Sequence, residues 1–127
     1  KNLKIEKIDT LLFHDPKQMI SSKGKSIFDE VIQIKKCGLV KKIGFSVYSP
    51  IEIRKILNKF EFDVLQCPYN IIDRRVEKSG ILKILRKKKI EIHARSIFLK
   101  GLLLINQKKY QKNSKNGKIY GEIGIIF

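Results

Sequence analysis

The chain has 127 residues, a formal net charge of +16 and two cysteines, Cys37 and Cys67. This length suits one domain with a sizeable core, and the sequence shows neither an apolar run long enough to cross a membrane nor an N-terminal targeting segment. The absence of both segments points to a cytoplasmic protein, or to a fragment of a longer one. Two cysteines this far apart argue against a disulfide framework and a Cys-x-x-Cys metal site, so we expect two buried free thiols.

The positive charge has two explanations. A basic domain is the electrostatic footprint of a nucleic-acid-binding protein. Here, however, the lysines are spread along the whole chain and isoleucine is abundant too, a composition that a strongly AT-rich genome imposes on any surface and core. The chain also lacks interleaved aromatic residues and a recognition-helix or stacking motif. We therefore expect no specific binding of nucleic acid, and keep a basic nucleic-acid-binding module as the alternative.

Short apolar runs alternate along the chain with segments whose apolar residues recur at helical spacing. Two helix starts carry caps: Ser26 and Asp29 have the spacing of a capping box, and Ser49 precedes Pro50 at a first helical position. The expected elements are a strand at 8–13, a polar loop at 16–25, a helix at 26–37, a strand at 39–45, a helix at 50–60, a strand at 62–66, a helix at 80–88 and a strand at 90–94.

The end of the chain differs from this pattern. Residues 106–118 consist mainly of Lys, Asn, Gln and Ser and have no apolar period, which predicts a solvated loop or a disordered tail. Residues 119–127 are apolar again, over too short a stretch to assign.

Polar side chains stand at the end of every expected strand. They are His14, Ser46, Gln66, Arg95 and Ser96. Because strands that alternate with helices form a parallel sheet, their carboxyl ends meet at one edge, where α/β folds bind ligands. A TIM barrel and a doubly wound open sheet both fit this spacing, although the second would normally carry a Gly-rich phosphate turn, which is missing. We expect no metal site, because His14 and His93 have no third ligand at a familiar spacing.

Four segments carry recognisable patterns: Ile8 to Pro16 (IDTLLFHDP), Gly38 to Ser46 (GLVKKIGFS), Asp63 to Asn70 (DVLQCPYN) and Ala94 to Leu103 (ARSIFLKGLL). They resemble four successive signatures of the aldo-keto reductases, in that family's order and at its separations. The resemblance covers about residues 1–104, from the fourth to just past the seventh strand of the family's (β/α)8 barrel. It implies an α/β fold, a partial TIM barrel of about four parallel strand–helix units over residues 1–105. Residues 106–127 would be a divergent polar tail.

The resemblance also implies roles for individual residues. His14 matches the family's active-site histidine, which hydrogen-bonds the substrate carbonyl and orients it. Ser46 and Gln66 match the side chains that hold the nicotinamide carboxamide of the cofactor, NADPH or NADH. The implied activity is reduction of an aldehyde or ketone by hydride transfer, which requires such positioning. Three residues fall in the loop beside the cofactor's pyrophosphate: Ser96, Phe98 and Lys100.

Two positions depart from the family pattern. Val47 stands where many members have asparagine, so one carboxamide contact is missing or is supplied otherwise. Arg95 replaces the aromatic residue that commonly stacks on the nicotinamide ring. A guanidinium can also lie flat against a ring, although its charge opposes that of an oxidised nicotinamide. We count Arg95 among the cofactor-binding residues and expect a divergent subgroup.

The family's proton-donating tyrosine, its partner lysine and its aspartate lie on the first three barrel strands, which this chain does not contain. We therefore expect the chain alone to be inactive, and a catalytically silent nucleotide-binding barrel stays open as a third interpretation. A partial barrel leaves sheet edges unpaired, and we expect its inner face to carry Ile, Leu and Val side chains without their opposite half. Such a chain is expected to self-associate through its open edges.

Overall fold

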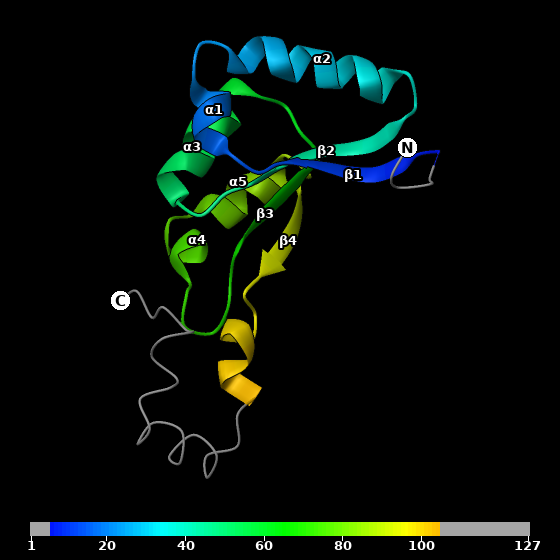
Figure 1. Ribbon diagram of the computed structural model, residues 1–127. Coiled ribbons are helices and arrows are strands. Elements are labelled where there is room, and N and C mark those ends of the chain that lie inside the picture. Colours follow the sequence, from blue (N-terminus) through cyan, green and yellow to red (C-terminus); the bar gives the residue numbers. More distant parts are fainter. Residues whose placement is uncertain (1–5, 105–127) are drawn as a thin grey trace. The chain divides into compact units, whose positions relative to one another are not determined.

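The computed structural model describes residues 6–104 and divides the chain after Arg95 into two units. The first unit is built on a parallel sheet whose spatial order, β1-β2-β3-β4, is also the order of its strands in the sequence (Figure 1). In the second unit, residues 96–104 include a 3₁₀ helix, η1 (Leu99–Leu104). The expected α/β class is confirmed. The strands are β1 (Ile8–Phe13), β2 (Val40–Ser46), β3 (Val64–Pro68) and β4 (Glu91–Arg95).

Helices connect successive strands, as parallel pairing requires. The longest, α2, packs on β2, while α1 packs on both α2 and α3, and α5 contacts α3 and β4 (Figure 1). The helices are α1 (Pro16–Ile20), α2 (Gly24–Lys36), α3 (Pro50–Lys59), α4 (Arg75–Lys78) and α5 (Ile81–Lys87).

The pairing register decides which residues share a face of the sheet. Phe13 pairs with Phe45, Ser46 with Gln66, and Gln66 with His93. Successive residues of a strand point to opposite faces, and Phe45 belongs to the core under the helices. Ser46, Gln66 and His93 therefore form one row on the other face, which we call the inner face.

Five phenylalanine rings form the centre of the core. The ring of Phe45 is fully buried, and its centroid lies 5.1 Å from that of Phe13 and 5.5 Å from that of Phe60. Phe28 lies 4.7 Å from Phe60, and Phe62 meets Phe45 edge-on at 5.0 Å. Such pairs stabilise a core by about 0.5–1.5 kcal/mol beyond the area they bury. Because the last paired residues of β1 and β2 belong to this cluster, it holds the ends of both strands in place.

The loop expected from Pro16 to Lys25 is wrong, since α1 occupies its first part. Asp15 caps this helix by accepting a hydrogen bond from the backbone N–H of Lys17 at 2.9 Å, and Pro16 follows at the first helical position. A helix of 5 residues is too short to show a helical period in the sequence, which is why it was missed.

The start of α2 also differs from the prediction. The helix begins at Gly24, with Lys23 as an N-cap that makes no side-chain hydrogen bond, so the capping box of Ser26 and Asp29 is wrong. Packing decides this start. A Cβ at position 24 would lie 1.7 Å from the carbonyl oxygen of Met19, so only glycine allows α1 and α2 to approach this closely.

Two further differences lie in the second half of the first unit. The strand expected at 62–66 runs two residues later, from Val64 to Pro68, and the Asp63 carboxylate just before it accepts the backbone N–H of Ile43 at 2.8 Å. The helix expected at 80–88 is confirmed as α5, whereas α4, a helix of 4 residues just before it, was not expected. The two helices are separated by Gly80, whose φ of +76° is a left-handed conformation that glycine adopts without strain.

Candidate active site

A hydrogen-bonded pair, Ser46 and Gln66, lies at the carboxyl ends of β2 and β3. The Ser46 hydroxyl donates to Oε1 of Gln66 at 3.0 Å, and Ser46 is only 1% exposed. This bond uses the hydroxyl proton and the amide oxygen. By valence, the Gln66 amide nitrogen then offers N–H donors and the Ser46 oxygen offers a lone pair to other groups. A donor beside an acceptor is complementary to a carboxamide.

His14 leaves the sheet at the level of this pair. It directly follows Phe13, whose partner in β2 is Phe45, and Ser46 directly follows Phe45. Since Phe13 packs in the core, alternation along β1 directs His14 towards the inner face. His14 is exposed, and the next residue, Asp15, is fixed as the cap of α1. The backbone of His14 is therefore held from both sides, directly after the last paired residues of β1 and β2.

The residue after Ser46 belongs to the core. Val47 is 0% exposed, and its backbone N–H continues the sheet by donating to the Gln66 carbonyl at 2.9 Å. The side chain at this position contributes packing and offers no polar atom to a ligand.

Arg95, the last residue of β4, lies over an aromatic ring. Its Cζ atom is 3.6 Å from the centroid of the Tyr48 ring. Arg95 pairs with Pro68 in the register, two residues beyond the pairing of Gln66 with His93. The arginine therefore belongs to the next row of the inner face, closer to the strand ends. Within the described part of the chain, its Nε and Nη2 atoms are buried and have no hydrogen-bond partner.

The loop after β3 is fixed by short-range hydrogen bonds. Oδ1 of Asn70 accepts the backbone N–H groups of Ile72 and Asp73 at 2.9 and 2.8 Å. The Tyr69 hydroxyl donates to Oε2 of Glu77 at 3.0 Å. This bond raises the pKa of Tyr69, because ionisation would break it and place two negative charges together. These bonds thus fix the conformation of the loop that follows β3.

Charged residues occupy the inner face nearer the amino ends of the strands. Lys42 pairs with one Glu91 oxygen at 2.5 Å, and Nε2 of His93 lies 2.9 Å from the other. The hydrogen bond from Lys42, and then that from His93, lowers the pKa of the Glu91 carboxyl, and the same bond to Glu91 raises the pKa of Lys42. The expectation of an inner face of Ile, Leu and Val is therefore wrong at these positions of β2 and β4, although Leu12 of β1 and Val64 of β3 do lie on this face.

The two cysteines have opposite environments. Cys67 of β3 is buried, and burial raises the pKa of its thiol. Cys37 is exposed, because it is the C-cap residue of α2. The prediction of two buried free thiols is confirmed for Cys67 and wrong for Cys37.

Three of the predicted cofactor residues belong to the second unit and are described within it alone. Ser96 is exposed and has a φ of +57°, and Phe98 is 54% exposed. Lys100 lies within η1. Among the predicted site residues, the first unit brings His14, Ser46, Gln66 and Arg95 to the same ends of neighbouring strands. The tail predicted at 106–127 lies outside the described residues.

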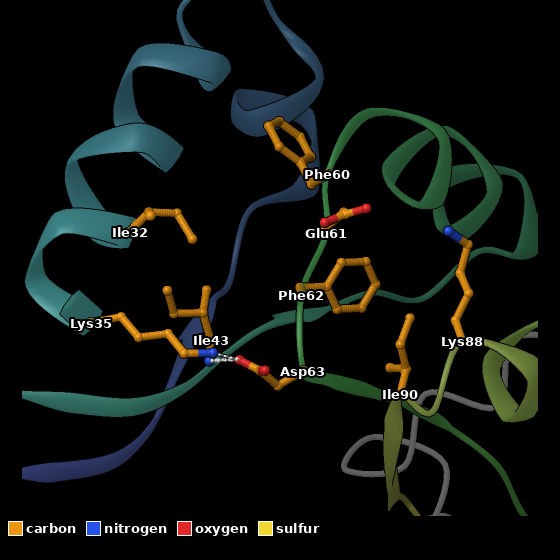
Figure 2. Close-up of a pocket in the computed structure, with 9 residues that line it drawn as sticks. All are labelled: Ile32, Lys35, Ile43, Phe60, Glu61, Phe62, Asp63, Lys88 and Ile90. Atoms are coloured by element: carbon orange, nitrogen blue, oxygen red, sulfur yellow. Dashed lines mark hydrogen bonds and ion pairs between the residues drawn. The ribbon is translucent and has the colours of Figure 1, made fainter. Parts of the chain in front are cut away.

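A cavity of about 470 Å³ opens at the opposite ends of the strands (Figure 2). Asp63 and Ile90, which directly precede β3 and β4, lie in its wall. The Asp63 carboxylate is already bound by Lys35 at 2.6 Å and by the backbone N–H of Ile43 at 2.8 Å. Since α/β folds bind ligands at the carboxyl ends of their strands, we place the site at the serine–glutamine pair. The cavity is lined by Ile32, Lys35, Ile43, Phe60, Glu61, Phe62, Asp63, Lys88 and Ile90.

Two residues of the inner face received no role from the sequence. Tyr48, which covers Arg95, follows Ser46 by two positions, and His93 is the register partner of Gln66. The period of two along each strand was available as a signal for both. What could not be read from the sequence was the register that sets β3 against β4.

Two features are missing from residues 6–104. No helix in this range is long and apolar enough to cross a bilayer. Nor do three or more His, Cys, Asp or Glu side chains gather there as a metal ion would need.

Solved structures share this fold. The thermostable aldo-keto reductase Tm1743, solved in complex with the inhibitor epalrestat, matches with a TM-score of 0.59 at 24% identity, over 94% of this chain and 43% of that one. Two structures of proposed aldo-keto reductases from Pseudomonas aeruginosa give TM-scores of 0.56 and 0.57 at 16% identity, over 71% of this chain and 34% and 35% of theirs. This chain thus spans less than half the length of each. The expected partial TIM barrel is confirmed.

No curated protein matches the sequence. The sequence model of the aldo/keto reductase family, however, matches residues 1–119. This span includes all four strands and the polar groups at their ends. The chain belongs to the aldo/keto reductase family.

Proposed function

We propose that this chain is part of an NAD(P)H-dependent oxidoreductase that reduces an aldehyde or a ketone. Membership of the family supports reductase chemistry. The observation that carries the proposal is the Ser46–Gln66 hydrogen bond at the carboxyl ends of two strands, with His14 leaving the neighbouring strand at the same level.

Each of these three residues has a distinct task. Gln66 donates to the oxygen of the nicotinamide carboxamide, and Ser46 accepts from its NH₂ group, which fixes the orientation of the ring. His14 donates a hydrogen bond to the substrate carbonyl oxygen, on which negative charge develops as the carbon is reduced. The cofactor supplies the hydride. The core beneath the strand ends keeps these groups in position.

The remaining cofactor contacts follow from the family pattern. We assign Ser96, Phe98 and Lys100 to the side of the pyrophosphate, and Arg95 to the neighbourhood of the nicotinamide. NADPH is the proposed cofactor, with NADH as a second substrate for the same site. The substrate is a small carbonyl compound.

The test compares this chain with a longer protein that contains it together with the preceding strand–helix units. NADPH oxidation in the presence of a panel of aldehydes and ketones is followed by the loss of its near-ultraviolet absorbance. The longer protein is expected to turn over. The chain alone is expected not to, because the family's tyrosine and lysine are absent from its sequence. Turnover by the chain alone, or none by the longer protein, would contradict the proposal.

A further inference from the structure

The guanidinium of Arg95 has two donors that the proposed function does not use. Its Nε and Nη2 atoms are buried and, in the described part of the chain, without a hydrogen-bond partner. Leaving a buried donor unpaired is unfavourable, and more so when the group is charged. Such groups are uncommon in folded proteins, so a partner that arrives with a ligand is the natural explanation.

Two other arginines of this molecule show what the Nε–Nη2 edge of a guanidinium binds. Arg74 places Nε and Nη2 on the two carboxylate oxygens of Glu77, at 2.8 and 2.6 Å. Arg75 does the same with Asp73, at 2.8 and 2.7 Å. In both pairs the side-on fork of the guanidinium holds both oxygens of one anion. Arg95 presents the same two atoms.

Tyr48 fixes the direction in which these donors point. With Cζ only 3.6 Å from the ring centroid, the guanidinium lies against the tyrosine ring. One face of the guanidinium is therefore covered by the ring. Its N–H bonds lie in the plane of the group and so point away from its edge, parallel to the ring. Tyr48 is 53% exposed, so the ring lies at the surface of the site.

The position of this edge relates it to the candidate site. Arg95 is the register partner of Pro68, and the preceding residues of the same face are His93 and Gln66. The unpaired donors thus lie one row from the carboxamide-binding pair. Pro68, the partner of Arg95 on the neighbouring strand β3, has no polar side-chain atom and so offers the guanidinium no side-chain acceptor.

We propose that the Nε–Nη2 edge of Arg95 binds an oxyanion, a carboxylate or a phosphate, next to the Ser46–Gln66 pair. The inference rests on the proposed function only for the origin of that group. A carboxylate would come from an oxo-acid substrate, and a phosphate from the cofactor or from a phosphorylated substrate. The bidentate hydrogen bonds that other arginines of the molecule donate to the carboxylates of Glu77 and Asp73 favour a carboxylate as the anion.

The test measures anion binding by the 127-residue chain, without cofactor, through the NMR resonance of the Arg95 Nε–H group. The probes are pyruvate, its uncharged analogue pyruvamide and inorganic phosphate, at constant ionic strength because a net charge of +16 attracts any anion. A saturable shift with pyruvate and none with pyruvamide supports a carboxylate site. A saturable shift with phosphate alone supports a phosphate site. No saturable shift with either anion, or an equal response to pyruvamide, overturns the proposal.

Matched variants separate the fork from general charge. The variants are compared by isothermal titration calorimetry, because a chain without Arg95 has no Arg95 Nε–H resonance. Arg95→Gln is expected to weaken anion binding at least about tenfold. Arg86→Gln, which removes the same charge from an exposed position, is expected to change it less than about twofold. Equal weakening by both variants overturns the proposal. If Arg95→Gln does not fold, Arg95→Lys keeps the charge without the fork and is expected to lose most of the binding.

The tyrosine provides a second, independent check. Tyr48→Phe keeps the ring and is expected to bind the anion as the original chain does. Tyr48→Ala frees the guanidinium and is expected to weaken binding several-fold. Normal binding by Tyr48→Ala would exclude the tyrosine as a positioning residue. Because no hydride transfer is measured, a failure of the proposed reductase activity leaves these results intact.

Discussion

At the scale of single residues, His14 is the group on which the proposed chemistry depends most. In a longer protein that contains this chain, His14→Ala should lower kcat/KM by one to three orders of magnitude, roughly 1.4–4 kcal/mol of transition-state stabilisation. The affinity for NADPH should stay the same, since the imidazole is assigned to the carbonyl oxygen. Steady-state kinetics with separate titration of both substrates would measure this.

Gln66→Ala is the matched comparison, because it removes a neighbour of His14 with a different task. It breaks the hydrogen bond with Ser46 and should raise the KM for NADPH first. If His14→Ala left kcat/KM unchanged, or if both variants impaired the same parameter, the assignment of roles would be wrong.

The two thiols differ enough in environment to react at different rates. A disulfide reagent should label Cys37 quickly, because the side chain is exposed at the end of α2. Cys67 should react only after unfolding, since burial hides it and raises its pKa, which lowers the fraction of reactive thiolate. Thiol counting would therefore give one fast group in the native chain and two in denaturant. Fast labelling of a Cys37→Ser variant would show that Cys67 is accessible.

At the scale of elements, the Lys42–Glu91 ion pair ties β2 to β4 across the strand between them. The lowered pKa of Glu91 means that its contribution to stability is complete above the ordinary pKa of a glutamate and is lost as the pH falls through the folded value. The raised pKa of Lys42 means that its contribution is complete below the ordinary pKa of a lysine and is lost as the pH rises through the folded value.

Glu91→Gln should therefore lower the melting temperature at neutral pH. The difference from the original chain should disappear in acid, where the glutamate is protonated and, like the glutamine that replaces it, carries no charge. Thermal melts followed by circular dichroism at several pH values would measure it. Glu30→Gln, the matched control, removes a carboxylate from an exposed position of α2 and should change the melting temperature little. A deficit for Glu91→Gln that persisted unchanged in acid would rule out the ion pair as its cause.

The elements also show what the sequence predicts well. All four strands were placed to within a few residues, because each is a short apolar run that ends at a polar residue, as β1 does at His14. The start of α3 at Ser49 and Pro50 was read from its cap. In contrast, α1 was missed, and the beginning of α2 depends on the contact of Gly24 with Met19, which is a property of the packed structure.

The site shows the same division. The strand ends could be named from the sequence because every strand points its carboxyl end to one edge. The pairing of Arg95 with Tyr48 could not, since it depends on the register of three strands and on the direction of a long side chain. The polar part of the inner face was missed for the same reason: Lys42, Glu91 and His93 look like ordinary surface residues until the register sets them together.

At the scale of the whole molecule, the sheet has two edges. In the described part of the chain, β1 pairs only with β2 and β4 only with β3. Unpaired edges offer backbone donors and acceptors to another chain, so we expect the chain to form dimers or larger assemblies as its concentration rises. Light scattering across a concentration series would measure this.

The charge of the chain works in the opposite direction, because a net charge of +16 repels a second copy. Association should therefore increase with salt, which screens this repulsion. A monomer at all concentrations and salt levels, with a sharp cooperative melt, would show that the edges are protected.

The order of the strands has a consequence for how the chain is made in the cell. Each strand after β1 pairs with the one that precedes it in the sequence, and each helix packs on elements near it along the chain, with α1 also contacting α3. A ribosome that releases the chain from its N-terminal end therefore delivers each partner in the order in which it is needed. The pairing of β1 with β2 does not require that β4 has been synthesised. Folding can advance during translation, one strand and one helix at a time, with each new segment added to a sheet that is already there.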